Sequence, residues 1–88
     1  MNRKNAHWMK REDERILEFL NVYGLASPDL ISNEVFRKVS SGHVRERLEL
    51  LQYAGLVALT GCKSYELTLA GKRYLRGELN ASHRPTQL

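Results

Sequence analysis

Residues 40–71, SSGHVRERLELLQYAGLVALTGCKSYELTLAG, contain the pattern that decides the fold of this 88-residue chain. In the first half, Val44, Leu48 and Leu51 follow the i, i+4, i+7 spacing of one face of an α-helix. Serine before such a run and glycine after it are common at helix ends. The pattern predicts a helix over residues 41–54 with a polar, exposed start.

The spacing of apolar residues changes after Gly55. Residues 56–59 and 64–67 are two short runs that contain Val, Leu and Tyr, and residues 60–63, TGCK, separate them. Short runs joined by a glycine-containing loop are typical of a β-hairpin. We therefore expect a hairpin over residues 57–67 with a basic tip.

Two helical patterns precede the quoted stretch. Residues 11–23 place apolar side chains on one face and acids in the first turn, where the helix dipole favours negative charge. The apolar residues expected to face the core are Ile16, Phe19, Leu20 and Tyr23. Ser27-Pro28 combines a hydroxyl cap with proline at the first helical position, so a short helix should run to about Phe36. Residues 37–39 form the next turn.

One more helix and two terminal segments complete the chain. Thr68 can cap a helix that fades at Gly77 and carries cations on its outer face. These cations are Lys72, Arg73 and Arg76. We expect one domain over residues 10–79, an N-terminal arm at residues 1–9 and a flexible tail at residues 80–88.

The order of these elements indicates the fold class. Helix, short helix, turn, longer helix, hairpin and helix is the arrangement of a winged helix-turn-helix, in which the second and third helices form the motif and the hairpin is the wing. The predicted class is α+β and mostly α, with a three-helix core, a two-stranded β-hairpin wing and a C-terminal helix.

Charge is distributed unevenly along the chain. Fourteen Lys and Arg against ten Asp and Glu give a net charge of +4. Residues 12–34 hold six acids and one arginine, a balance of −5, whereas residues 37–47 and residues 63–76 each hold four cations and one acid, a balance of +3. Clustered positive charge favours nucleic-acid binding, although a solvated charged face is the plainer alternative.

Several function classes find no support in the sequence. Apolar runs are too short to span a bilayer, and no secretory signal is evident, so we expect a cytoplasmic, nucleoid-associated protein. The lone Cys62 and three scattered histidines make a metal site improbable, and no cofactor motif is present. Because neighbouring acids lack a histidine partner, we expect no enzyme. Cys62 beside Lys63 leaves a redox-sensing thiol as a minor alternative.

Particular residues carry a family resemblance. Val44-Arg45-Glu46-Arg47-Leu48, Ala54-Gly55-Leu56-Val57 and the run 65–71, YELTLAG, are similar to small archaeal winged-helix transcription regulators. The closest resemblance is to the haloarchaeal phage-repressor-like family, and the MarR and arsenical-repressor families are more distant. The resemblance implies a sequence-specific double-stranded DNA-binding regulator from an archaeon or an archaeal virus. Such a repressor would occupy its operator with helix 41–54 in the major groove and wing 57–67 on the backbone.

The candidate DNA contacts follow from this placement. Arg45 and His43 would face base edges, and the fork of an arginine matches guanine O6 and N7. Arg47 borders the apolar stripe, so it could contact a phosphate or form an ion pair with Asp13. A serine at the helix start could act as a cap and as an anion contact. The complete predicted set is Arg37, Lys38, Ser40, Ser41, Gly42, His43, Arg45, Arg47, Lys63 and Ser64.

Three questions stay open at this level. A winged helix can also serve as a protein–protein interaction module, which would require an exposed apolar patch. The same basic face could bind RNA. A homodimer is possible on a two-fold DNA site, and pairing would have to use the first helix, the last helix or the Trp8 segment.

Overall fold

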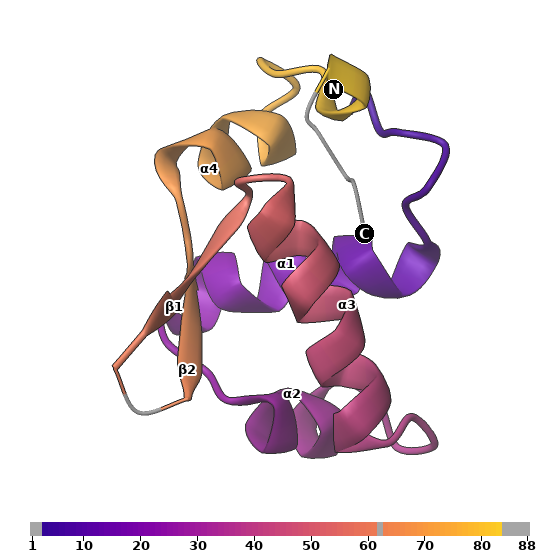
Figure 1. Ribbon diagram of the computed structural model, residues 1–88, viewed down its shortest axis with the longest axis vertical. Coiled ribbons are helices and arrows are strands. Elements are labelled where there is room, and N and C mark those ends of the chain that lie inside the picture. The colour runs from indigo at the N-terminus through magenta and orange to yellow at the C-terminus, as the bar shows by residue number, and fades with distance from the viewer. Residues whose placement is uncertain (1–2, 62, 84–88) are drawn as a thin grey trace.

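The computed structural model describes residues 3–61 and 63–83 (Figure 1). Its elements are α1 (Arg11–Tyr23), α2 (Pro28–Glu34), α3 (Ser41–Tyr53), β1 (Val57–Thr60), β2 (Ser64–Leu67), α4 (Leu69–Leu75) and the short 3-10 helix η1 (Ala81–His83). The predicted fold class is confirmed: the protein is α+β, mostly helical, with four α-helices and an antiparallel hairpin. Helix α2 stops at Glu34, slightly earlier than expected.

Hydroxyl caps fix where three of the helices begin. The side chain of Ser27 accepts a hydrogen bond from the Leu30 amide at 3.2 Å, and Ser40 accepts one from the His43 amide at 3.1 Å. Thr68 caps α4 by accepting from the Gly71 amide at 3.1 Å. Each cap satisfies one amide that has no partner inside its helix. These three predicted helix starts are confirmed.

The wing is a two-stranded sheet with one additional β-bridge on its edge. β1 and β2 pair in an antiparallel register from Val57 opposite Leu67 to Thr60 opposite Ser64. Ala26 then pairs with Tyr65 on the other edge of β2, and their backbones exchange hydrogen bonds of 3.1 and 2.8 Å. This bridge, which the sequence pattern did not reveal, holds the connection between α1 and α2 against the wing.

The core lies where α1, α3 and α4 meet the base of the hairpin. Its largest fully buried apolar side chains are Ile16, Leu17, Leu20, Ile31, Val44, Leu48, Leu51, Leu56, Val57 and Tyr74. The inward-facing prediction for Tyr23 is wrong, because its side chain is 58% exposed. The Tyr23 ring instead stacks on Phe19 at a centroid distance of 5.0 Å, near the point where α1 leaves the core.

The described part of the N-terminal segment packs on the domain and does not form an extended arm. The Arg3 guanidinium donates to the Leu75 carbonyl at 3.1 Å and forms ion pairs with Glu14 and Glu18 at 3.0 and 2.6 Å. The hydrogen bond to Glu18, and to a lesser extent that to Glu14, raises the pKa of Arg3. The Tyr74 hydroxyl donates to Glu14 from the other side. Arg3 and Glu14 thus connect the segment before α1 to both α1 and α4.

Residues 80–83 also differ from the predicted flexible tail. The Ala81 amide donates to the Lys4 carbonyl at 2.8 Å, and the Ala81 side chain is fully buried. Ala6 is buried in the same core. Isolated alanines give no periodic signal in a sequence, which is why this packing of the two ends was not predicted. The rest of the predicted tail lies outside the described residues.

Gly71 provides a direct test of the packing of α4 against the wing. A Cβ at this position would lie 2.2 Å from the Leu56 carbonyl oxygen and 2.8 Å from Leu67 Cδ2. We expect Gly71→Ala to lower the free energy of unfolding by about 2–3 kcal/mol, because the clash is with backbone and outweighs the better helix propensity of alanine. Gly42→Ala is the matched control, since its nearest contact would be Ser40 Oγ at 3.9 Å. Urea denaturation that finds the two variants equally stable would contradict this packing.

Candidate nucleic-acid interface

The connection between α2 and α3 is held by contacts to its backbone. Ser32 of α2 donates from its hydroxyl to the Val39 carbonyl at 2.6 Å. Arg15 of α1 donates to the Val35 carbonyl at 3.0 Å, and its guanidinium lies 5.1 Å from the centre of the Phe36 ring. Phe36 itself is buried. The turn therefore leaves Arg37 and Lys38 exposed while its backbone is anchored, which fixes the start of α3.

A buried ion pair anchors the middle of α3 to the first turn of α1. Arg47 donates from Nε to Asp13 Oδ1 at 2.9 Å and from Nη2 to Asp13 Oδ2 at 2.6 Å. Asp13 also accepts the Lys10 amide at 2.9 Å, and Arg47 reaches the Trp8 carbonyl at 3.2 Å. The hydrogen bonds to Asp13 raise the pKa of Arg47. Arg47 is 8% exposed and Asp13 is fully buried. Of the two roles expected for Arg47, the structure therefore shows the ion pair with Asp13 and not an exposed guanidinium available to a phosphate.

His43 is drawn to the same side of α3 as Arg47. Its Nε2 lies 3.6 Å from Glu12 Oε1 in α1. Positions 43 and 47 are one helical turn apart, so both face α1. His43 is half-buried there and does not line the hollow described next, although it was predicted to meet base edges.

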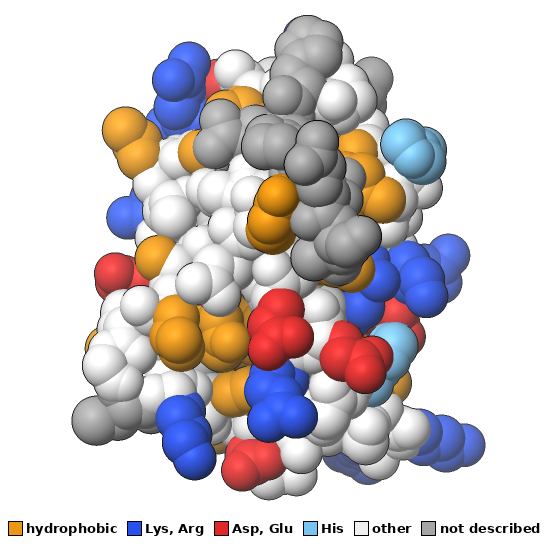
Figure 2. All heavy atoms as spheres, viewed as in Figure 1, with side chains coloured by type: hydrophobic (Ala, Val, Ile, Leu, Met, Phe, Trp, Pro, Cys, Tyr) orange, Lys and Arg blue, Asp and Glu red, His pale blue; other side chains and the backbone are white. Residues whose placement is uncertain are grey.

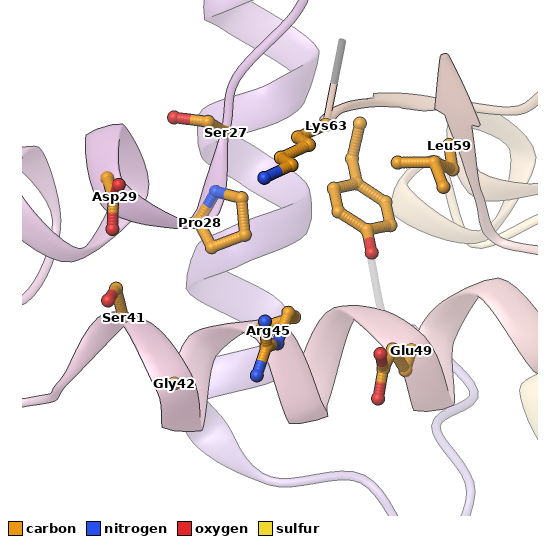
Figure 3. A pocket seen from close by; sticks show the side chains of 10 residues that line it. Ser27, Pro28, Asp29, Ser41, Gly42, Arg45, Glu49, Leu59 and Lys63 are labelled. Atoms are coloured by element: carbon orange, nitrogen blue, oxygen red, sulfur yellow. The ribbon is translucent and has the colours of Figure 1, made fainter. Parts of the chain in front are cut away.

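A hollow of about 630 Å³ separates α3 from the wing. Three elements line it: the starts of α2 and α3, and the inner face of the hairpin (Figure 3). Its lining residues are Ser27, Pro28, Asp29, Ser41, Gly42, Arg45, Glu49, Leu59, Lys63 and Tyr65. Arg45 extends from α3 and Lys63 from the hairpin tip toward the same space. Neither cation forms an ion pair with a carboxylate among the described residues, so both charges are available to a ligand.

The hairpin tip places Lys63 in an uncommon backbone conformation. Lys63 has a φ of 62°, in the left-handed region that costs a non-glycine residue about 1–2 kcal/mol. Its amide donates to the Gly61 carbonyl at 2.8 Å, and Thr60 Oγ1 donates to the Ser64 carbonyl at 3.0 Å. These bonds close the turn and turn the lysine toward the hollow.

Tyr65 forms the wall between the two charged elements. The side chain is 5% exposed, and burial raises the pKa of its hydroxyl. The negative charge of Glu49 raises that pKa further, whereas the positive charge of Arg45 lowers it. The phenol is therefore close to both α3 side chains and stays neutral at physiological pH.

The structure divides the predicted set into groups. Ser41, Gly42, Arg45 and Lys63 line the hollow, while Ser40 caps α3 and Ser64 lies half-buried at the start of β2. Arg37 and Lys38 are exposed in the turn before α3. The residues missed by sequence reasoning are Ser27, Pro28, Asp29, Glu49, Leu59 and Tyr65. Ser27 and Pro28 were recognised only as a helix start, and the Ala26–Tyr65 bridge is what brings them to the wing.

The basic segment 63–76 is split in space. Lys63 lies at the hollow, whereas Lys72 and Arg73 belong to α4 and Arg76 directly follows it, at the opposite end of the molecule from α2 (Figure 1). Arg73 and Arg76 also approach Glu78 at 4.0 and 3.4 Å. Figure 2 shows acidic and basic side chains interspersed over α3 and the wing. The candidate interface thus combines a few cations with acids and is not a uniformly basic surface.

The described residues contain neither a cluster of metal ligands nor a helix suited to a membrane. Within residues 3–61 and 63–83, no group of three or more His, Cys, Asp or Glu side chains could hold a metal ion. None of the helices in this part of the chain is long and apolar enough to cross a membrane. Cys62, the predicted redox alternative, lies outside the described residues.

Comparison with known proteins gives one strong structural likeness. No protein-family model matches the chain, and no curated protein matches it in sequence. Among solved structures, the PhiH1 repressor-like protein from Haloarcula marismortui superposes with a TM-score of 0.90 and 29% sequence identity, over 99% of each chain. This likeness confirms a winged-helix repressor-like fold and supports the resemblance to haloarchaeal phage-repressor-like proteins. The more distant resemblance to the MarR and arsenical-repressor families stays a prediction.

The Arg47–Asp13 pair yields a stability prediction. We expect Arg47→Met to lower the free energy of unfolding by about 3–5 kcal/mol, because it leaves the Asp13 carboxylate buried without its counter-charge. Arg37→Met, which removes an exposed cation from the turn, should change stability by less than about 0.5 kcal/mol. Replacing both partners, as in Asp13→Leu with Arg47→Met, should recover part of the loss. Equal chemical denaturation midpoints for Arg47→Met and Arg37→Met would contradict the proposal that the Arg47–Asp13 pair anchors α3 to α1.

Proposed function

We propose that the protein is a double-stranded DNA-binding transcription regulator whose contact surface is the hollow between α3 and the wing. The observation that carries this proposal is the convergence of Arg45 and Lys63, from two separate elements, on one open space beside the start of α3. Neither cation is neutralised by a described acid. A groove-binding helix and a backbone-contacting wing require charges placed in this way.

Each element has a role in this proposal. The start of α3 enters the major groove, where Arg45 presents its fork to guanine O6 and N7. Lys63 contacts a phosphate beside the groove, and Arg37 and Lys38 contact the backbone on the other side of α3. The α3 start, with Ser41 and Gly42, is slender enough to approach the DNA closely. The protein acts in the cytoplasm as a repressor that occupies its operator, and it uses no cofactor and no catalytic step.

The structural neighbour supports the same function. That protein from Haloarcula marismortui is described as repressor-like, and the likeness covers nearly all of both chains. A shared fold alone does not determine function, so the charges in the hollow remain the more direct argument. A protein–protein interaction module would need no convergent cations at this position.

The test is a salt titration of binding to duplex DNA of random sequence. Affinity of the wild type should fall steeply with salt, and Lys63→Ala should reduce the slope of log K against log salt by about 0.9, the value for one phosphate contact. Arg45→Ala should also weaken binding, because it removes a positive charge beside the DNA. Lys72→Ala, on α4, is the matched control and should leave both affinity and slope unchanged.

The outcomes separate this function from its rivals. Absence of duplex binding at low salt would contradict the proposal and favour the interaction module. Equal loss in Lys72→Ala and Lys63→Ala would mean that the hollow is not the contact surface. Stronger competition by duplex RNA than by duplex DNA would favour RNA binding.

We further propose that two copies pair on a two-fold DNA site through the end of α1. Val22, Tyr23 and Leu25 are 86%, 58% and 51% exposed, and they are close together in the chain. Of the three surfaces considered from sequence, the Trp8 segment is partly buried on the core, and the last helix exposes one large apolar residue, Leu69. The end of α1 therefore offers more apolar area to a second copy.

Sedimentation with and without DNA tests this pairing. We expect the wild type to bind a two-fold site as a dimer and Tyr23→Glu to bind it as a monomer, because a charge would be buried in the interface. Leu69→Glu introduces the same charge on α4 and should leave the dimer intact. Identical stoichiometry for the wild type and Tyr23→Glu would contradict pairing through α1.

A further inference from the structure

Two acids, Asp29 of α2 and Glu49 of α3, line the hollow, and the proposed DNA contact does not explain them. Glu49 lies one helical turn after Arg45, so the two side chains share one face of α3 and both line the hollow (Figure 3). A carboxylate on a surface that meets phosphates weakens binding by repulsion. The position of Glu49 therefore needs a reason other than general affinity.

Glu49 also differs from the acids of α1, all of which have a partner. Glu12, Asp13, Glu14 and Glu18 each have a cationic or histidine partner within 4.0 Å. Within the described residues, no hydrogen bond or ion pair engages the carboxylate of Glu49, even though Arg45 is its neighbour on the helix. Arg45 and Glu49 thus present opposite charges side by side without neutralising each other.

The chemistry of a carboxylate limits what it can bind in a DNA groove. An ionised glutamate only accepts hydrogen bonds. In the major groove, cytosine offers its N4 amino group, whereas guanine offers the acceptors O6 and N7, and adenine places the acceptor N7 next to its N6 donor. A hydrogen bond from cytosine to a glutamate is therefore favourable, whereas the acceptors of guanine repel the carboxylate. This repulsion contributes to specificity, because it lowers the affinity for sites with the wrong base.

We propose that Glu49 is a specificity-determining residue that accepts a hydrogen bond from the N4 amino group of a cytosine. This inference rests on the proposed DNA-binding function. Four residues of helix rise by about 6 Å, against about 3.4 Å per base pair. Arg45 and Glu49 consequently read base pairs about two steps apart, a guanine with Arg45 and a cytosine with Glu49.

The neighbourhood of Glu49 is suited to this role. Tyr65 is buried behind it, and Leu59 of the wing lines the same hollow. These side chains limit the water that can reach the carboxylate once DNA fills the hollow, which strengthens a hydrogen bond to a base. Lys63 lines the hollow from the other side and supplies the attraction to phosphate that offsets the repulsion by Glu49.

The experiment selects bound duplexes from a randomised pool with the wild type, Glu49→Gln and Glu46→Gln. Glu46 is the matched control, because it is exposed on α3 but does not line the hollow. Both variants remove one negative charge, so both should bind random DNA more tightly than the wild type does. Only Glu49→Gln should lose the cytosine preference, by about tenfold, and gain adenine at that position, because a glutamine amide pairs with adenine N6 and N7.

The results distinguish this inference from the function on which it rests. The role of Glu49 is supported if the wild type enriches sites with a cytosine and Glu49→Gln does not. If the wild type and Glu49→Gln enrich the same sites, the role of Glu49 is overturned, while DNA binding is left intact. The role is also overturned if Glu46→Gln changes the base preference by as much as Glu49→Gln does. Failure of the wild type to bind any duplex overturns both proposals.

Discussion

The buried ion pair between Arg47 and Asp13 is the interaction on which the arrangement of α3 depends. Burying both charges is favourable only when their hydrogen bonds are satisfied. Here Asp13 accepts from Arg47 and from the Lys10 amide, and Arg47 also reaches the Trp8 carbonyl. The pair therefore joins α3, the start of α1 and the segment before it. Because it engages one side of α3, the opposite side is left to face the wing.

A small number of contacts also shapes the hollow. The Ala26–Tyr65 bridge holds the start of α2 beside the hairpin, and the closed turn at the tip directs Lys63 inward. Arg45 completes the site from α3. None of these contacts uses the cations of α4, which lie at the other end of the molecule (Figure 1). A net charge of +4 thus says less about the site than does the position of two cations.

Much of the fold could be predicted from sequence because local signals were strong. The apolar spacing of α3, the glycine-containing loop of the hairpin and the hydroxyl caps at Ser27 and Thr68 are determined by nearby residues. Two contacts depend on residues far apart in the chain: the packing of Ala81 beside Lys4 and the bridge at Ala26. No local sequence pattern predicts either of them. Arg45 and Lys63, which were predicted as DNA contacts, both line the hollow, and their contact with DNA stays a prediction. Glu49 gives no local signal of a role in DNA binding, and only its place in the hollow suggests one.

The start of α3 and the wing tip together form the proposed DNA-contacting surface. The most direct measurement is a titration of isotope-labelled protein with a short duplex, followed by amide chemical shifts in two-dimensional NMR spectra. We expect the largest changes in residues 41–49 and at Lys63, with α4 and η1 unaffected. Changes concentrated at α4, around Lys72 and Arg76, would contradict it, because the contact surface would then lie at the opposite end of the molecule.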